Sequence, residues 1–228
     1  MDWRDFGHRM AGMAQDLLAQ GSVETTLERI TGSATELVDG CDASGILLLD
    51  HGRARSLASS CPLVEELDRL QHRLGRGPCF DAARRGVEER VFRFPDLTLH
   101  EPRWPDFVPA AQALGVGSMM GFLLFTEDES FGALNIYSRR PGAFSEISEA
   151  AGIMLASHAA VALSGARTHA QMQEAVASRH QIGEAMGILM ASRHLTEQQA
   201  FDVIRRYSQE TNTKLREVAR LICEQGSL

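Results

Sequence analysis

The pattern of hydrophobic and polar positions predicts a mixture of helices and strands over the first two thirds of the chain. Apolar side chains recur at helical spacing over four segments, residues 2–20, 23–38, 62–73 and 105–114. Shorter apolar or alternating runs bounded by turn residues predict five strands, residues 43–50, 54–59, 90–94, 116–125 and 131–137. The short polar segments at 51–52 and 127–130 are expected to join strands as hairpins. The expected fold class is α+β, an antiparallel sheet with packed helices.

One long helix is predicted to follow. Ser145 is a suitable N-cap, and no proline occurs after Pro141, so the helix is expected to continue to Ser192. A helix of this length is typical of a coiled coil between subunits. Its apolar residues form a loose seam at spacings of three and four: Met154, Val161, Met172, Ala175, Ile182, Met186 and Leu189. A symmetric homodimer through this helix is therefore expected, although His158, Gly165 and Arg179 interrupt the seam.

Two shorter helices are predicted at the C-terminus. Thr196 and Gln199 have the spacing of a capping box for a helix to about Thr211. Thr213 is the expected N-cap of a last helix, which Gly226 terminates. Together with the end of the long helix these segments predict a small three-helix bundle. Tyr207 is expected on the inner face of this bundle.

Residues 178–222 closely resemble the ANTAR family, the RNA-binding output domain of bacterial transcription antiterminators. The matching residues, in order, are Ser178-Arg179, Ile182-Gly183, Gly187-Ile188-Leu189-Met190, Ala200-Phe201, Arg205, Ser208, Asn212 and Lys214-Leu215. The chain departs from the family at Glu184-Ala185-Met186-Gly187, where Gln-Ala-Lys-Gly is usual. This difference removes local positive charge.

The preceding part resembles the GAF domains that actinobacterial proteins fuse to this output domain. The resembling segments are Leu67–Gln71, Gly75–Cys79, Pro102–Phe107, Gly115–Ser118 and Gly132–Tyr137. The two resemblances imply a GAF-like sensor domain over residues 1–166 and an ANTAR RNA-binding domain over 167–228. The first ANTAR helix is expected to be continuous with the last GAF helix.

The resemblance implies RNA hairpins as partners, and the polar side chains outside the bundle core are the candidates to bind them. The candidate RNA-binding residues are Arg179, Gln181, Arg205, Arg206, Ser208, Asn212, Lys214 and Arg216. Arg and Lys would contact phosphates, with Arg220 a further candidate, while the amides and the hydroxyl would bind exposed bases. The competing interpretation is that these residues solvate the helices and pair with neighbouring acids.

Charge is distributed unevenly between the two parts. The chain carries a net charge of −7. Residues 167–228 hold eight Lys or Arg and seven Asp or Glu, a net +1, so the first 166 residues carry −8. This balance argues against indiscriminate binding to nucleic acid, which needs local cations.

The remaining composition points to a cytoplasmic protein without cofactor, metal or catalytic site. No apolar run approaches the roughly 20 residues that span a bilayer, the N-terminus lacks the pattern of a signal peptide, and no membrane association is expected. The four cysteines form no CxxC pair or zinc-site spacing and are expected to be reduced thiols. Cys79 lies in Gly75-Arg76-Gly77-Pro78-Cys79, where nearby arginines would lower the pKa of a thiol.

These observations favour a signal-responsive transcription antitermination regulator that binds hairpins in nascent RNA, with an unknown small-molecule or redox signal at the GAF domain. The main alternative is a cysteine-based redox sensor or reductase that uses Cys79. A dimerising scaffold that no longer binds RNA is a third possibility, because Met186 replaces the usual lysine. DNA binding by the helical module is a fourth, which its near-neutral charge disfavours.

Overall fold

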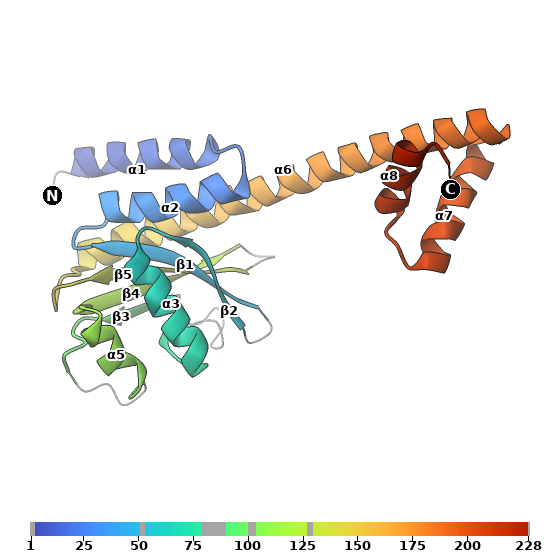
Figure 1. Cartoon of the computed structure of the whole chain (residues 1–228). Coiled ribbons are helices and arrows are strands. Elements are labelled where there is room, and N and C mark those ends of the chain that lie inside the picture. The colour runs from blue at the N-terminus through green and yellow to red at the C-terminus, as the bar shows by residue number, and fades with distance from the viewer. Residues whose placement is uncertain (1–2, 51–52, 79–89, 100–103, 127–129, 228) are drawn as a thin grey trace. The chain divides into compact units, whose positions relative to one another are not determined.

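The chain folds into two compact units, Met1–Arg167 and Thr168–Leu228. The structure is a computed structural model that describes residues 3–50, 53–78, 90–99, 104–126 and 130–227. The first unit contains a sheet with packed helices and the second consists of helices (Figure 1). The expected α+β fold class is confirmed.

The sheet of the first unit has five antiparallel strands in the order β2-β1-β5-β4-β3. The strands are β1 (Ala43–Asp50), β2 (Arg53–Ser59), β3 (Val91–Phe94), β4 (Ser118–Phe125) and β5 (Ser130–Ser138). All five predicted strands are therefore confirmed to within two residues. Of the predicted turns at 51–52 and 127–130, residues 51–52 and 127–129 lie outside the described residues, and Ser130 begins β5.

Helices cover both faces of this sheet. Figure 1 shows α2 (Val23–Leu37) and the start of α6 (Glu146–Arg193) on one face, with α1 (Trp3–Leu18) outside α2. The helices α3 (Pro62–Leu74) and α5 (Phe107–Ala113) lie on the opposite face. The alternation of side chains along β5 builds a core on each face. Leu134 and Ile136 belong to the core with α2 and α6, and Tyr137 belongs to the core with α3 and α5.

Local sequence signals place the helix ends. Pro62 opens α3 as predicted, and Gly75 closes it with φ of +60°, a left-handed conformation that suits glycine. Ser145 caps α6 through a 3.2 Å hydrogen bond that its hydroxyl accepts from the Ser148 amide. The helix α5 begins two residues later than predicted, after Asp106.

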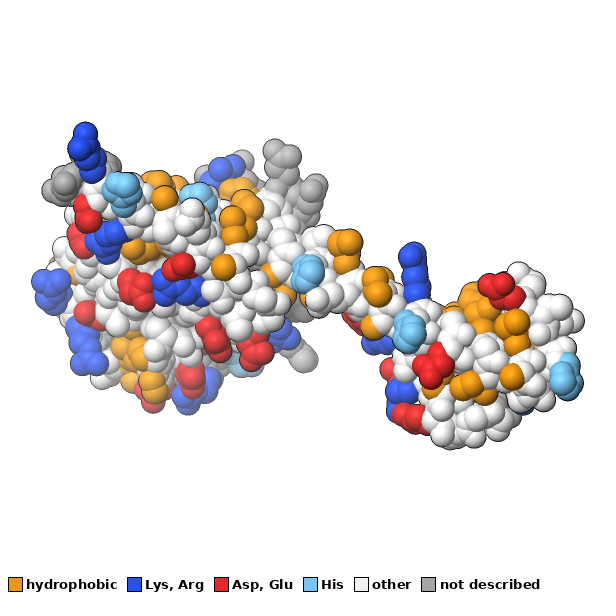
Figure 2. Space-filling view, turned by 90° about the horizontal axis from the view of Figure 1, so that it is seen from above, with side chains coloured by type: hydrophobic (Ala, Val, Ile, Leu, Met, Phe, Trp, Pro, Cys, Tyr) orange, Lys and Arg blue, Asp and Glu red, His pale blue; other side chains and the backbone are white. Residues whose placement is uncertain are grey.

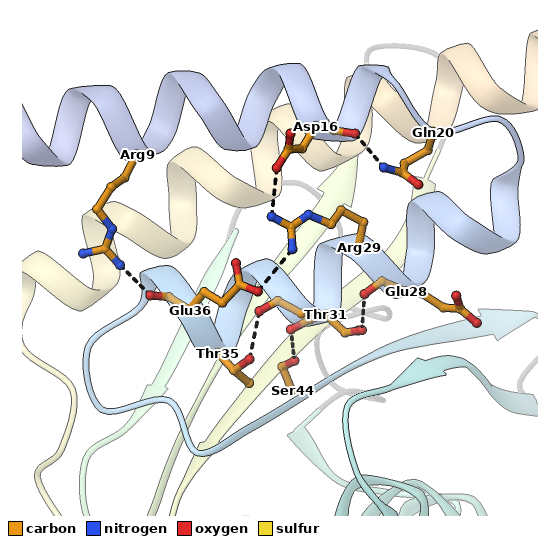
Figure 3. A network of polar contacts seen from close by, with 10 residues as sticks. Arg9, Asp16, Gln20, Glu28, Arg29, Thr31, Thr35, Glu36 and Ser44 are labelled. Atoms are coloured by element: carbon orange, nitrogen blue, oxygen red, sulfur yellow. Dashed lines mark hydrogen bonds and ion pairs between the residues drawn. The ribbon is translucent and has the colours of Figure 1, made fainter.

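A polar network fixes α1 on α2 (Figure 3). Arg29 on α2 forms ion pairs with Asp16 of α1 at 2.9 Å and with Glu36 at 3.2 Å. Partial burial lowers the pKa of Arg29, but the hydrogen bonds to Glu36 and Asp16 outweigh this effect and raise it. Arg9 of α1 also donates to the Glu36 backbone carbonyl. The two helices are thus held by charge as well as by the buried side chains of α1.

The helix α6 reaches Arg193 and confirms the predicted long helix. The predicted seam along it is only partly exposed. Met154, Val161 and Met172 are 39%, 60% and 64% exposed, whereas Leu189 is fully buried in the second unit. Ile182 and Met186 also pack against that core, so the C-terminal part of the seam serves the bundle instead. Figure 2 shows hydrophobic side chains at the surface along α6.

The apolar character of α6 exceeds what the sequence analysis expected. Within the described part of the chain, α6 is the one helix long and apolar enough to cross a membrane by length and composition. Half of its apolar window is buried inside the protein, which is typical of a core helix. Close packing against the sheet explains the small residues there. A Cβ atom at Gly152 would collide with the Phe122 ring of β4.

Candidate RNA-binding surface

The second unit is a bundle of three helices whose inner faces are apolar. The end of α6 packs with α7 (Glu197–Thr211) and α8 (Leu215–Gln225). The fully buried residues are Ala185, Leu189, Ala200, Ile204, Val218, Ala219 and Ile222. The predicted capping box is confirmed. The Gln199 amide donates to the Thr196 hydroxyl at 3.3 Å, and the Thr196 amide donates to the Gln199 side chain at 2.9 Å.

A tight corner joins α7 to α8. Asn212 closes α7 in the left-handed conformation, with φ of +51°, which asparagine tolerates better than most residues. The Ser208 hydroxyl donates to the Thr213 carbonyl at 2.6 Å and holds the corner shut. Two of the candidate RNA-binding residues, Ser208 and Asn212, therefore also shape the backbone.

The expected N-cap of α8 was wrong by one residue. Lys214 occupies the N-cap position, without a side-chain capping bond. The Thr213 hydroxyl instead donates back to the Thr211 carbonyl at 3.4 Å. Because the left-handed residue sends the chain away from α7, Lys214 is exposed where α8 begins.

Several of the candidate arginines are already paired with carboxylates of the same unit. Arg205 lies 2.8 Å from Asp202, and Arg216 pairs with Glu174 and Glu217. Arg220 pairs with Glu217 at 3.2 Å and with Glu224 at 2.8 Å. Such exposed pairs are weak, so a phosphate can replace the carboxylate at little cost.

Three other cations carry no ion pair within the described residues. They are Arg179 on α6, Arg206 on α7 and Lys214 at the start of α8. All three side chains are exposed. These residues are the strongest candidates for phosphate contacts, since they bring charge that no neighbour neutralises.

A groove lies beside Arg179, between α6 and the start of α7. It encloses about 690 Å³ and is lined by Arg179, Ile182, Gly183, Met186, Thr196, Glu197, Gln198 and Phe201. Phe201 is half-buried and brings an aromatic ring to the same groove that Arg179 lines. Unpaired bases stack on aromatic rings and on arginine, so this groove has the chemistry to hold a base. Phe201 was not among the candidate RNA-binding residues, because the helical pattern marks it simply as apolar.

The structure distributes the candidate residues over different parts of the bundle. Arg179 lines the groove, whereas Ser208, Asn212 and Lys214 gather at the α7–α8 corner. Gln181 is half-buried, and its backbone carbonyl accepts a weak 3.7 Å hydrogen bond from the Cys223 thiol.

Tyr207 and Met186 are two further residues of the bundle that the sequence singled out. Tyr207 is 37% exposed and lies outside the buried core, so its placement on the inner face was wrong. By helical spacing it follows Ala200 and Ile204, so it lies at the exposed margin of the face that these two residues bury. Met186, which stands where the family has lysine, is half-buried and lines the groove.

Three of the four cysteines lie within the described residues. Cys41, Cys61 and Cys223 form no disulfide. Burial raises the pKa of Cys41 to about 12, which makes its thiol unreactive. Cys79, the candidate for redox chemistry, lies outside the described residues. Within those residues no three His, Cys, Asp or Glu side chains come together as a metal site.

Comparison with protein families assigns both units. The model of the GAF domain matches residues 20–164, well over half of the chain, and the model of the ANTAR domain matches residues 170–222. The chain belongs to the GAF domain family and carries a C-terminal ANTAR domain. Its architecture is that of an RNA-binding antitermination regulator with a GAF sensor domain. A comparison with curated proteins found no match.

Solved structures confirm the fold of the GAF domain. The GAF domain of a phosphoenolpyruvate-protein phosphotransferase from Coxiella burnetii is 21% identical, with a TM-score of 0.60 over 75% of this chain and 99% of that one. The corresponding domain from Acinetobacter is 19% identical, with a TM-score of 0.56 over 74% and 97%. A free methionine-R-sulfoxide reductase from Neisseria meningitidis is 15% identical, with a TM-score of 0.54 over 72% and 91%. At these identities the likeness concerns the fold alone.

Proposed function

We propose that this chain is a dimeric, signal-responsive antitermination regulator whose ANTAR domain binds hairpins in nascent RNA. Residues 1–166 would form the sensor and residues 167–228 the RNA-binding output, within the cytoplasm. A nascent leader can form either an antiterminator hairpin or a terminator hairpin. Binding to the first excludes the second, and a few kcal/mol of differential affinity changes the choice by orders of magnitude.

The observation that carries this proposal is the ANTAR domain with its uncompensated cations. Arg206 and Lys214 lie on and after α7, and Arg179 lies beside a groove with Phe201. Phosphate contacts by the cations combined with a base held in the groove would favour a hairpin loop over a regular duplex. In a duplex the bases are stacked and are not available to the groove.

Dimerisation is proposed through the exposed apolar face of α6 within the GAF domain. Ile147, Met154 and Val161 are spaced by seven residues and are 40%, 39% and 60% exposed. Residues 150–166 contain no Asp, Glu, Lys or Arg, so two copies of this segment meet without charge repulsion. A second copy of the same helix, related by twofold symmetry, is the partner that buries this face.

Binding of the full chain to RNA tests the proposed function directly. Its affinity for a hairpin with an unpaired loop should exceed its affinity for duplex DNA of equal length at the same stated salt concentration. The hairpin would come from RNAs that crosslink to the tagged protein in cells. Equal affinity for both nucleic acids, or no crosslinked RNA, would contradict the proposal.

A further inference from the structure

A cavity in the GAF domain has the size of a small-molecule site. It lies between β1, β2 and α3 and encloses about 540 Å³. Ligand sites in proteins commonly enclose roughly 300–1,000 Å³. Leu47, Leu57 and Ala58 provide the apolar part of its lining, and charged residues from β2 and α3 provide the rest.

Asp68 is the unusual member of this lining. Its side chain is on the buried face of α3, with the residue only 4% exposed. Both carboxylate oxygens are buried, and apart from the Ser56 hydroxyl they have no hydrogen-bond partner among the described residues. Burial raises the pKa of Asp68 to about 6, with a smaller lowering from the Ser56 hydroxyl and a further rise from Glu65. A buried carboxylate with so few donors is costly, and a ligand with N–H donors would reduce that cost.

The other charged groups of the cavity determine what else the ligand must carry. Arg55 and Arg69 are exposed, line the cavity and form no ion pair within the described residues. Glu65 accepts a 3.1 Å hydrogen bond from the Ser59 hydroxyl, and His72 completes the titratable groups that face the cavity. Two arginines thus balance two carboxylates. A ligand that is neutral overall but carries both charges matches this lining.

We propose that the cavity between β1, β2 and α3 binds a small zwitterion, an amine that also carries an acidic group. Its ammonium group donates to the Asp68 carboxylate, and its acidic group accepts from Arg55 and Arg69. The apolar side chains of Leu47, Leu57 and Ala58 contact the carbon skeleton between the two ends. This inference rests on the proposed sensor role of the GAF domain and gives that role a class of ligand.

Calorimetric titration of the full chain with matched small molecules tests the proposal. The probes are the standard L-amino acids, their N-acetyl derivatives, which lack the ammonium group, and their amides, which lack the acid. We expect at least one amino acid to bind with one molecule per chain, and both of its derivatives to bind at least tenfold more weakly. Asp68→Asn should weaken binding of the amino acid at least tenfold, and so should Arg55→Gln combined with Arg69→Gln.

Glu66→Gln is the matched control, because Glu66 is an exposed neighbour on α3 that does not line this cavity. It should bind like the parent chain. Binding by no amino acid, equal binding of the N-acetyl derivative, or unchanged binding by Asp68→Asn would each overturn the proposal. Hairpin affinity is measured in parallel without added ligand. If no amino acid binds but the parent chain still binds the hairpin, only the zwitterion proposal fails. If the parent chain does not bind the hairpin, the proposed function itself is contradicted.

Discussion

The Ser208 hydroxyl lies 2.6 Å from the Thr213 carbonyl oxygen and ties the last turn of α7 to the residue before α8. The Thr213 amide also donates to the Ser208 carbonyl at 3.1 Å, so these two residues are linked in both directions. The corner that presents Lys214 therefore depends on a residue that the sequence analysis assigned to base recognition.

Ser208→Ala should lower the free energy of unfolding of the ANTAR domain by about 1 kcal/mol, because the Thr213 carbonyl loses its donor. Urea denaturation followed by circular dichroism measures this change. Ser192→Ala is the control, since it removes a similar hydroxyl bond to the Ile188 carbonyl on an exposed face of α6. Equal stability of the two variants would show that the corner does not need this bond.

Lys214→Ala should weaken hairpin binding about tenfold without changing the helical content, because one uncompensated phosphate contact is worth roughly 1–3 kcal/mol. Arg220→Ala is the matched control. Arg220 is held between Glu217 and Glu224 and should contribute less to RNA binding. A smaller effect for Lys214 than for Arg220 would place the contact surface elsewhere.

Phe201→Leu should weaken hairpin binding by about 1–3 kcal/mol, since leucine keeps the apolar packing but removes the aromatic ring on which a base stacks. Thermal melting of the same variant checks that the bundle is intact. Val203→Leu, a half-buried position on the same helix outside the groove, is the comparison. If both variants bind RNA like the parent chain, the groove does not hold a base.

Met154→Glu combined with Val161→Glu should convert the chain to a monomer in sedimentation velocity, because two like charges per helix would face each other across the pair. Gln173→Glu, exposed on α6 outside this face, should leave the oligomeric state unchanged. A parent chain that is monomeric at all concentrations would refute the dimer.

Asp68→Asn should change how stability depends on pH. Burial raises the pKa of Asp68 from its ordinary 3.8 to about 6, so the folded chain holds a proton that the unfolded chain has released. Stability should therefore fall as pH rises from about 4 to about 6, by on the order of 3 kcal/mol. The asparagine variant lacks this loss, so its stability relative to the parent should increase over the same range. If the stability of the two proteins changes with pH in the same way, Asp68 does not have a raised pKa in the folded chain.

Periodicity alone was sufficient to predict the strands and most helix boundaries, because the sheet buries both faces and its strands read as apolar runs. It failed where one residue has two potential partners. Ile182, Met186 and Leu189 fit a dimer seam and a bundle core equally well by spacing, and only the position of α7 and α8 decides between them. The cavity with Asp68 was not predictable either, because an acid on an amphipathic helix reads as a solvated position until β1 and β2 cover it.

The candidate RNA-binding residues were found by resemblance and helical position, but their pairing was not. Asp202 and Arg205 are three residues apart, so their contact follows from the helix. Glu174 and Arg216 are far apart in sequence and meet only because α8 packs on α6. Long-range pairing of this kind depends on the tertiary fold, which side-chain spacing does not encode.

The ion pairs of Arg205, Arg216 and Arg220 have a consequence for thermodynamics in solution. When an arginine exchanges a carboxylate for a phosphate, the RNA releases a counterion and the freed carboxylate takes one up. The net release of ions is therefore close to zero. The net release of ions then comes from the uncompensated cations, which are Arg179, Arg206 and Lys214. At about 0.7–0.9 ions per cation, a plot of log Kd against log salt should have a slope of roughly 2–3. The domain would consequently remain bound to its hairpin over a range of ionic strength that dissociates more strongly basic nucleic-acid-binding modules.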